Sequence, residues 1–356
     1  MGATPRYPLP ESNFDEKKPS GQQVPFVTMP ALVTKLHCLM RLFLAPMEGV
    51  VDHHVRELLT SIGGIDICVT EFLRITENQC LPERVFKRLC PELDQNSQTA
   101  SGTSVRLQLL GGHPATMAYN ATLAAKLGAS AIDLNFGCPA KVVNKNDGGA
   151  SLLKTPSRIY DIVKAVRDSV PSTTPVTAKI RLGFEDRSRY LENAVAAEEG
   201  GANELTVHAR SKADGYQPPA YWDYIGRINE RLNIPVIANG EIWSPQDWRR
   251  CKEQSNCEDF MLGRGLLARP DLALAIKAEA NNDDYQDLPW ELILEQVYRY
   301  HKITEALYPK KHLGNRTKQW LMYLRATYPA AEQLFNRVRK ERSSEAFEEI
   351  FDQAFQ

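Results

Sequence analysis

Residues 131–141 read Ala-Ile-Asp-Leu-Asn-Phe-Gly-Cys-Pro-Ala-Lys, and the way this stretch begins and ends bears on the whole fold. Ile132 and Leu134 alternate with polar residues, as in a β-strand. Gly137 permits unusual backbone dihedrals, while Pro139 fixes its own φ and restricts Cys138. We therefore expect a thiol on a stiff loop at the C-terminal end of a strand. A cysteine in isolation is more often a small buried apolar residue, so its role depends on the other strand ends.

The composition places the chain among ordinary globular proteins. Its 356 residues suffice for a large domain and a small one, and 43% hydrophobic and 24% charged residues are typical values. No apolar run is long enough to span a bilayer, and the first residues lack the features of a signal peptide. The seven cysteines are scattered, without a C-x-x-C motif. We expect a cytoplasmic monomer with no metal and no membrane partner.

Residues 1–39 differ from the rest of the chain. They contain six prolines and few periodic apolar positions. Such a composition cannot bury enough apolar surface to offset the entropy of ordering. We expect a disordered N-terminal extension over 1–39.

A repeating unit of strand and helix begins near residue 40. The apolar runs of strand length are Leu42–Pro46, Ile67–Phe72, Val105–Leu110, Ala131–Phe136, Val176–Leu182, Glu204–Ala209, Pro235–Asn239 and Asp259–Gly263. The helical patterns between them include Asp52–Ser61, Pro114–Leu127, Pro156–Val170, Arg189–Glu199, Tyr221–Leu232 and Pro245–Lys252. Eight such units predict an α/β fold, a (β/α)8 TIM barrel over 40–285. A doubly wound open sheet is less favoured, because no G-x-G-x-x-G follows the first strand.

The last part of the chain, 286–356, has only helical periodicity and predicts a C-terminal helical bundle. The helical segments are Trp290–Leu307, Arg316–Thr327, Ala330–Arg339 and Ser344–Phe355. Between Arg299 and Arg342 there are eleven Lys or Arg residues against three Asp or Glu, although the whole chain has a net charge of −1. This excess suits a surface that binds a phosphate backbone, and it equally suits a solvated helix face.

Polar residues follow the predicted strands where a barrel places its active site, at the C-terminal ends. They are Glu48, Glu71, Gln108, Asn135, Cys138, Lys179, Arg181, His208, Arg210, Asn239, Glu241 and Arg264. Each has an ordinary structural explanation, and His208 alone would more often be a satisfied core histidine. Lys179 is harder to explain in this way, since a buried ammonium is costly without a partner. We expect these side chains to meet at one rim.

The last two strand ends have the composition of a phosphate site. Gly240 and Gly263 permit close approach of backbone N–H groups to an anion, and Arg264 can pair with it. A phosphate-bearing cofactor held there would lie across the rim toward Lys179 and Gln108.

With these residues in view, the chain resembles the flavin-dependent tRNA-dihydrouridine synthases from about residue 40 to about residue 339. The motifs that carry the resemblance are Ala-Pro-Met-Glu-Gly at 45–49, Leu-Asn-Phe-Gly-Cys-Pro at 134–139, Ala-Lys-Ile-Arg-Leu-Gly at 178–183, Val-His-Ala-Arg at 207–210, Ile-Ala-Asn-Gly-Glu-Ile at 237–242 and Leu-Gly-Arg-Gly at 262–265. The pattern Arg-x-Lys-Gln-Trp-Leu-x-Tyr at 316–323, with Arg74 and Arg339, is similar to the bacterial C subfamily. That subfamily is associated with position 16 of the tRNA D-loop.

The resemblance implies FMN as the prosthetic group, held by the 40–285 catalytic domain, and NADPH (or NADH) as its reductant. The implied cofactor-binding residues are Pro46, Met47, Glu48, Gln108, Lys179, His208, Asn239, Gly240, Glu241, Gly263 and Arg264. Reduced flavin would deliver hydride to uracil C6, and Cys138 would protonate C5 from the opposite face. A thiol suits this step because its reference pKa of about 8.5 keeps it mostly protonated at neutral pH.

The resemblance also implies a tRNA substrate whose D-loop uridine leaves its stack to reach the flavin, and a helical tRNA-binding domain at 286–356. The implied tRNA contacts are Arg74, Asn135, Arg181, Tyr216, Arg316, Lys318, Tyr323 and Arg339. One departure from the family pattern is Asp147, which adds a negative charge near the expected RNA path where relatives are often richer in glycine.

Three other functions remain open on the sequence. A flavin barrel acting on a small pyrimidine would have no need of the basic helical tail. A Schiff-base aldolase could use Lys179, but it would be colourless. A non-catalytic RNA-binding barrel would leave Cys138 without a purpose.

Overall fold

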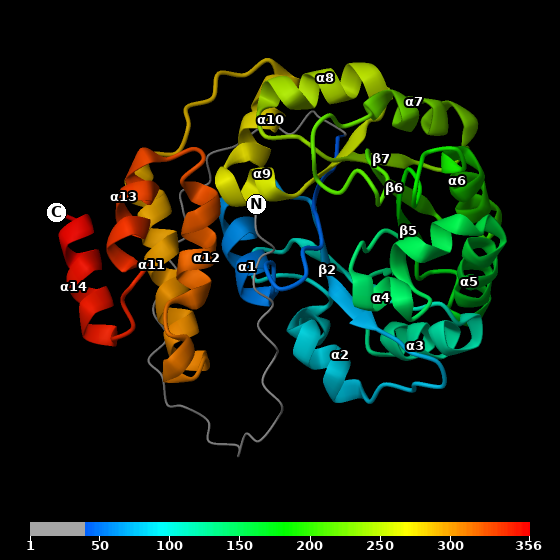
Figure 1. Cartoon of the computed structure of the whole chain (residues 1–356), viewed down its shortest axis with the longest axis horizontal. Coiled ribbons are helices and arrows are strands. Elements are labelled where there is room, and N and C mark those ends of the chain that lie inside the picture. The colour runs from blue at the N-terminus through cyan, green and yellow to red at the C-terminus, as the bar shows by residue number, and fades with distance from the viewer. Residues whose placement is uncertain (1–39) are drawn as a thin grey trace.

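The computed structural model describes residues 40–356, so the extension expected over 1–39 lies outside the described residues. Eight parallel strands pair in sequence order, and β8 returns to β1, which confirms the predicted closed barrel (Figure 1). The strands are β1 (Leu42–Leu44), β2 (Ile67–Arg74), β3 (Ser104–Leu110), β4 (Ile132–Asn135), β5 (Val176–Arg181), β6 (Glu204–His208), β7 (Val236–Asn239) and β8 (Asp259–Leu262).

Helices surround the barrel and cover the outer face of the sheet (Figure 1). They are α1 (His53–Ile62), α2 (Glu83–Leu89), α3 (Pro114–Lys126), α4 (Lys141–Lys145), α5 (Pro156–Ser169), α6 (Tyr190–Glu199), α7 (Trp222–Arg231), α8 (Pro245–Ser255), α9 (Arg264–Ala268) and α10 (Leu272–Asn281). Helix α2 is missing from the sequence prediction, because its seven residues bury only Phe86 and show little periodicity. Within residues 40–356, no helix is both long and apolar enough to cross a membrane.

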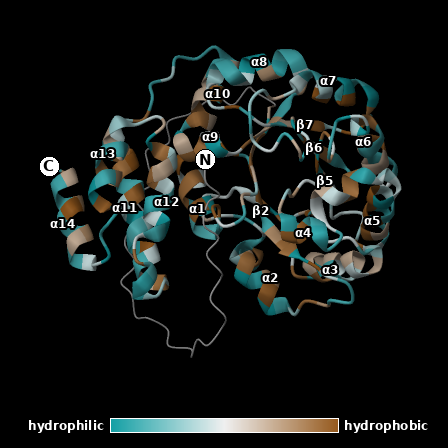
Figure 2. Ribbon diagram, viewed as in Figure 1, coloured by the Kyte–Doolittle hydropathy of each residue, from teal (hydrophilic) through white to brown (hydrophobic). Residues whose placement is uncertain are grey.

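The two-residue period of the strands divides the hydrophobic core in two. Leu42, Leu44 and Ile132 face outward and belong to the large cluster between sheet and helices. Phe43 and Met261 face inward and belong to a small separate cluster inside the barrel. Figure 2 shows hydrophobic and hydrophilic residues mixed on the covering helices, as expected for helices that bury one side.

Toward its C-terminal rim, the interior of the barrel is polar rather than apolar. Gln108, Asp133, Thr177 and His208 are buried at inward positions of β3, β4, β5 and β6. Because buried polar groups are costly unless they are hydrogen-bonded, this face must be held by specific pairs rather than by packing alone. The apolar runs seen in the sequence therefore describe mainly the outer face of the sheet.

The C-terminal helices form a second layer beside the barrel (Figure 1). They are α11 (Trp290–Leu307), α12 (Asn315–Leu324), α13 (Pro329–Val338) and α14 (Ser344–Ala354). The bundle meets the barrel at its α1 and α9 helices, which contact α11 and α12 respectively. Trp320, Leu321 and Phe347 are buried in the same continuous core as the barrel helices, so the bundle packs as part of one hydrophobic body.

Candidate active site

A chain of hydrogen bonds runs across three strands toward the rim. The Thr177 hydroxyl donates to Asp133 Oδ1 at 2.6 Å, and Gln108 Nε2 donates to Asp133 Oδ2 at 2.7 Å. Gln108 Oε1 in turn accepts from Asn135 Nδ2 at 2.8 Å. Fully satisfied buried networks of this kind hold their members in a single arrangement. Gln108 is completely buried, and its amide is committed on both sides to β4.

The last member of that chain holds the loop that carries Cys138. Asn135 Oδ1 accepts two backbone N–H bonds, from Gly137 and Cys138, each at 3.0 Å. Arg181 Nε donates to the Gly137 carbonyl at 2.9 Å. The Cys138 carbonyl accepts from Asn144 Nδ2 at 3.1 Å. The loop is therefore tied to β4, β5 and α4, and the partly exposed Cys138 stands at the rim as the sequence indicates.

Three basic side chains lie beside that loop: those of Lys179, Arg181 and His208. Lys179 Nζ donates to Asn239 Oδ1 at 2.9 Å and forms no ion pair with the rest of 40–356. Burial, with the Arg181 guanidinium nearby, lowers the pKa of Lys179 to about 7. Burial and the charges of Arg181 and Lys179 also lower the pKa of His208 well below its ordinary value, so this imidazole is neutral. An anion bound here would restore the ammonium of Lys179.

The turn after β7 is shaped for close approach. Gly240 has φ +118°, and a Cβ at this position would lie 2.8 Å from His208 Cδ2. Trp222 Nε1 donates to the Gly240 carbonyl at 2.9 Å. The next residue, Glu241, also has a positive φ and pairs with the buried guanidinium of Arg210. No side chain can replace this glycine without displacing His208, which fits the cradle that the sequence predicts.

Arg264 completes the predicted phosphate end of the rim. Its guanidinium carbon lies 5.0 Å from the Trp243 ring centre and 5.2 Å from that of Tyr216. Its nearest carboxylate oxygen, on Glu241, is 3.7 Å away. The carboxylate is shared with Arg210, so Arg264 keeps hydrogen-bonding capacity for another anion. The donor set and the glycine cradle together fit a phosphate-bearing cofactor.

The loop after β1 includes Pro46, Met47 and Glu48 and lies beside the turn after β8, because β1 and β8 are paired strands. Burial raises the pKa of Glu48 above its ordinary value. Burial, with the nearby charge of Glu48, raises the pKa of Glu71 to about 7. The Glu71 carboxylate accepts a hydrogen bond from the Gly49 N–H. Glu48 within this loop and Glu71 beside it therefore both ionise less readily than ordinary carboxylates.

Some of the residues predicted to contact tRNA lie together at the rim. Tyr216 is 54% exposed, and the guanidinium carbon of Arg181 lies 5.1 Å from its ring centre. Tyr323 of α12 lies close enough to Arg264 and Tyr216 for their charges to influence its pKa, which burial raises. Arg74 lies at the end of β2, whereas Arg339 is exposed at the far end of α13. The arrangement joins barrel and bundle residues across one surface.

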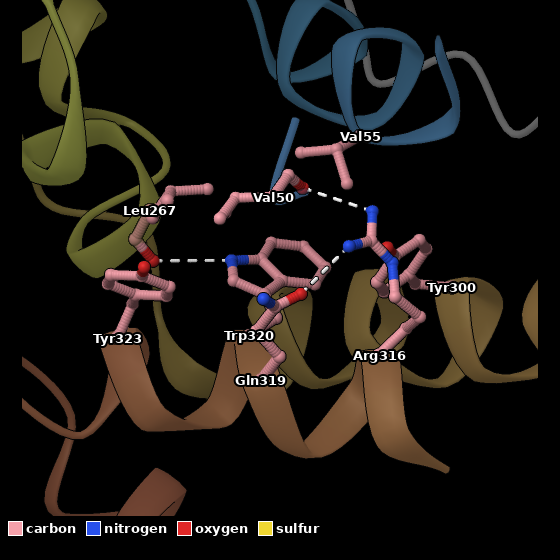
Figure 3. Close-up of a pocket in the computed structure, with 8 residues that line it drawn as sticks. All are labelled: Val50, Val55, Leu267, Tyr300, Arg316, Gln319, Trp320 and Tyr323. Atoms are coloured by element: carbon pink, nitrogen blue, oxygen red, sulfur yellow. Dashed lines mark hydrogen bonds between the residues drawn. The ribbon is translucent and has the colours of Figure 1, made fainter. Parts of the chain in front are cut away.

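Arg316 and Lys318 occupy more confined positions. Arg316 (Figure 3) has a side chain only 16% exposed. It forms an ion pair with Asp52 of the β1–α1 connection. Lys318 Nζ donates to the Glu341 carbonyl at 2.7 Å. Burial, with the nearby Arg342, lowers the pKa of Lys318. Both cations are thus engaged within the protein, a feature that a count of basic residues does not reveal.

Several residues outside the sequence prediction support the site. Asp133 and Thr177 carry the chain of hydrogen bonds, Asn144 holds the Cys138 carbonyl, and Gln319 contacts the Gly49 carbonyl. The sequence could have indicated Asp133, because its carboxylate stands between two apolar residues of a strand. Gln319 stands in the motif at 316–323, but no local pattern indicates its partner, which lies 270 residues away.

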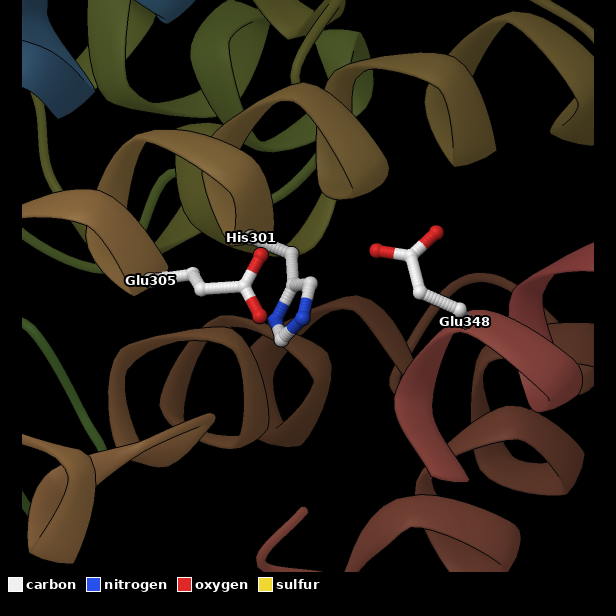
Figure 4. A group of neighbouring side chains, drawn as sticks. All are labelled: His301, Glu305 and Glu348. Atoms are coloured by element: carbon white, nitrogen blue, oxygen red, sulfur yellow. The ribbon is translucent and has the colours of Figure 1, made fainter. Parts of the chain in front are cut away.

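A second group of ionisable side chains lies away from the rim, within the bundle. His301, Glu305 and Glu348 bring potential ligand atoms within 4.8 Å of one another (Figure 4). The Lys302 ammonium donates to Glu305 at 2.6 Å and to Glu348 at 2.7 Å. Tyr298 also donates to Glu348, at 2.8 Å. Since the Lys302 ammonium already pairs with both carboxylates, the group links α11 to α14.

Comparisons with known proteins agree with this geometry. The tRNA-dihydrouridine(16) synthase of Pseudomonas putida is 50% identical over 302 residues, 85% of this chain and 93% of the relative. That of Shewanella oneidensis is 49% identical over 315 residues, 88% of this chain and 98% of the relative. A solved histamine dehydrogenase from Rhizobium sp. 4-9 has a TM-score of 0.50 at 15% identity, over 67% of this chain and 45% of that one, which is a likeness of fold alone.

The family match covers nearly every described residue. A family model described as dihydrouridine synthase (Dus) matches residues 43–356, the barrel and the bundle together. The chain therefore belongs to the dihydrouridine synthase family, the oxidoreductases that form dihydrouridine in tRNA.

Proposed function

We propose that this protein is a cytoplasmic, FMN-dependent tRNA-dihydrouridine synthase that uses NADPH to reduce uridine 16 of the D-loop. One observation carries the proposal more than any other. The Cys138 loop, held by Asn135, stands on the same rim as the Lys179 side chain, which hydrogen-bonds only an uncharged amide among the described residues. Position 16 is supported by relatives of this name that are about 50% identical to the chain.

The residues of the rim divide into two groups by what they offer a cofactor. Gly240, Gly263 and Arg264 would hold the phosphate of FMN, and Lys179 would hydrogen-bond the polar edge of its ring. The Pro46–Glu48 backbone would contact the ring from the other side. When bound, FMN supplies the hydride for uracil C6 after its reduction by NADPH. The Lys179 ammonium would stabilise negative charge on the reduced ring.

Cys138 would hold the proton that uracil C5 receives. A thiol with the reference pKa of about 8.5 is mostly protonated at neutral pH, as this role requires. Its loop is fixed by Asn135 and Arg181, so the Sγ atom approaches the uracil from a constant direction. A uridine must leave its stack to reach this point, which costs a few kcal/mol and is easiest in an already unstacked D-loop. Tyr216, half-exposed beside Arg181, offers a ring on which a base can stack.

The surface formed by the rim and the bundle would bind the tRNA backbone. We propose that 286–356 serves as the tRNA-binding domain, with Arg74, Tyr323 and Arg339 among its contacts and those of the adjoining rim. Arg316 and Lys318 remain candidates, although both are already engaged within the protein.

A spectrum of the purified protein tests the cofactor assignment. We expect flavin absorption bands and NADPH-dependent formation of dihydrouridine in tRNA that lacks it. A folded preparation that is colourless and does not take up added FMN would refute the assignment. Mapping dihydrouridine in tRNA from a strain without this protein decides the position, and loss at a site other than 16 would correct that part.

Replacement of Cys138 tests the proton donor. We expect Cys138→Ala to keep FMN and tRNA binding and to lose turnover about 10²- to 10⁴-fold, the usual contribution of a general acid. Cys80→Ala is the matched control, because Cys80 is an exposed cysteine outside the rim. Normal turnover in Cys138→Ala would remove this residue from the mechanism.

A further inference from the structure

The peptide group of Gly49 is held from two sides by different parts of the molecule. Gly49 follows Pro46–Glu48 directly and has φ +72°, a conformation that turns the chain toward α1. Its N–H donates to the Glu71 carboxylate, which belongs to β2 of the barrel. Its carbonyl accepts from Arg316 Nη1 at 2.6 Å and from Gln319 Nε2 at 3.1 Å, both on α12 of the bundle.

Arg316 extends this hold along the connection into α1. Its second terminal nitrogen donates to the Val50 carbonyl at 3.2 Å (Figure 3). The same nitrogen donates to the Asp52 carboxylate. Asp52 uses its other oxygen to cap α1, by accepting from the Val55 N–H at 3.0 Å. Despite burial, the pKa of Asp52 lies below its ordinary value because of the Arg316 charge and that cap. One buried guanidinium thus fixes three successive points of the loop.

Gln319 orients the guanidinium as well as the loop. Its Oε1 accepts from Arg316 Nη1 at 2.9 Å, while its Nε2 donates to the Gly49 carbonyl. Figure 3 shows Gln319 and Arg316 pointing from one side of α12 toward the barrel. The amide therefore closes a small ring of hydrogen bonds that only a residue with both a donor and an acceptor can complete.

The same helix also contacts the neighbouring connection, the one after β8. Trp320 Nε1 donates to the Leu267 carbonyl at 3.2 Å, near the end of the short helix α9 that begins at Arg264 (Figure 3). Trp320 is buried, whereas the next residue but one, Met322, is 43% exposed. Helix α12 therefore contacts the connections after β1 and after β8, which are neighbours on the rim and both belong to the proposed cofactor site.

We propose that Arg316 and Gln319 are positioning residues for the loop after β1, so that the helical bundle sets the backbone of Pro46–Glu48 for the flavin. The inference rests on the proposed function only in assigning this loop to the flavin. It gives the bundle a task besides RNA binding, and it explains why a predicted RNA contact, Arg316, is engaged by backbone carbonyls. Cofactor and RNA sites then share one helix.

Hydrogen–deuterium exchange of the full-length protein tests the hold on the loop without reliance on activity. Gln319→Leu keeps the size of the side chain and removes both hydrogen bonds, and Arg316→Lys keeps the charge and removes the fork. We expect backbone amides of 47–52 to exchange at least threefold faster in each variant, with the β4–β6 amides unchanged. Met322→Ala on the same helix is the control and should leave 47–52 as in the wild type.

FMN affinity, measured by the quenching of flavin fluorescence, tests the consequence. We expect the affinity to fall about three- to tenfold in Gln319→Leu, the usual effect of a lost hydrogen bond, and to stay unchanged in Met322→Ala. Unchanged exchange at 47–52 in Gln319→Leu would overturn the proposal, and so would faster exchange with undiminished affinity. If Arg316→Lys fails to fold, Gln319→Leu decides alone. If the wild type binds no FMN, the proposed function fails, while the exchange result still shows whether α12 holds the loop.

Discussion

Lys179 illustrates how single residues at this rim acquire their chemistry from neighbours. An exposed lysine is charged at any physiological pH, with an ordinary pKa of about 10.4. In the barrel, burial and Arg181 lower the pKa of Lys179 to about 7, and its ammonium donates to an uncharged amide oxygen on Asn239. Lys179 therefore binds its proton weakly in the ligand-free protein, and an anionic ligand would strengthen that binding.

We predict that FMN binding takes up a proton at pH 8. The Lys179 amine is mostly neutral in the ligand-free protein at this pH, and a bound anion raises its pKa and recharges it. Titration calorimetry in HEPES and in Tris should therefore give different apparent enthalpies, because the two buffers release protons with different heats and neither supplies a phosphate to the site. Lys179→Met should abolish the difference, and equal heats in the wild type would contradict the prediction.

Glu71 allows a prediction about stability. Its folded pKa of about 7 exceeds the ordinary value of about 4.3, so its contribution to stability is fully present below about pH 4.3 and is lost as the pH rises through 7. Glu71→Gln cannot ionise, yet it can still accept from the Gly49 N–H. We expect the variant to be more stable than the wild type by on the order of 2 kcal/mol at pH 8, with little difference at pH 4.

Urea unfolding at the two pH values measures this difference for Glu71→Gln. Glu258→Gln is a suitable control, because Glu258 is exposed and its carboxylate lies 3.6 Å from a lysine on the barrel surface. A variant of Glu71 less stable than the wild type at pH 8 would show that its negative charge is needed in the fold.

At the level of elements, the segment from Cys138 to Gly149 is a folded loop rather than a free one. The Asp147 carboxylate pairs with Arg158 of α5, whose other terminal nitrogen donates to the Gly112 carbonyl at 2.7 Å. A Cβ on Gly112 would lie 1.8 Å from the Asp147 carbonyl oxygen, so the two loops touch. The negative charge expected near the RNA path is therefore paired with Arg158 and anchors the Cys138 loop.

We predict that Arg158→Ala lowers kcat three- to tenfold while leaving FMN affinity unchanged. The loop would lose its distal anchor but keep Asn135 and Asn144 beside Cys138, and the pair is too exposed to cost more than about 1 kcal/mol of stability. Steady-state kinetics and thermal unfolding check both parts. Arg227→Ala, which breaks a comparably exposed pair on α7, is the control. An unaltered kcat would show that the loop holds its shape without Arg158.

On the scale of the whole molecule, the basic side chains of the bundle differ in how accessible they are to RNA. Arg316 and Lys318 are bound by carboxylate and carbonyl groups of the protein itself. Arg339 and Lys340, at the end of α13, are exposed. An RNA backbone can recruit exposed cations at little cost, whereas it must compete for the engaged ones.

We predict that Arg339→Ala combined with Lys340→Ala weakens tRNA binding and reduces the slope of log K against log salt by about 1 to 2, the value for one or two lost phosphate contacts. Binding measured between 50 and 200 mM salt provides the slope. Lys164→Ala, at an exposed position on the barrel helix α5, should leave it unchanged. A slope identical to that of the wild type would make this end of the bundle a solvated surface.

Some features follow from local spacing alone. Strand period, helix period and chain-breaking residues placed all eight strands within a few residues, and helix α11 at its observed bounds. They also placed polar residues at the strand ends, because in a parallel barrel every such end lies at one rim. Helix α2 was not predicted, because a short helix with one buried residue shows no hydrophobic periodicity.

Other features depend on contacts that no local pattern encodes. The stiffness of the Gly-Cys-Pro turn could be read from residues 137–139, but its anchors on Arg181 and Asn144 could not. The pKa of Lys179 is set by burial and by Arg181, and the hold of α12 on Gly49 joins residues 267 and 270 positions apart. Backbone preferences act over a few residues and are legible in the sequence. Desolvation and long-range hydrogen bonds arise only when the closed barrel and the bundle bring distant groups together.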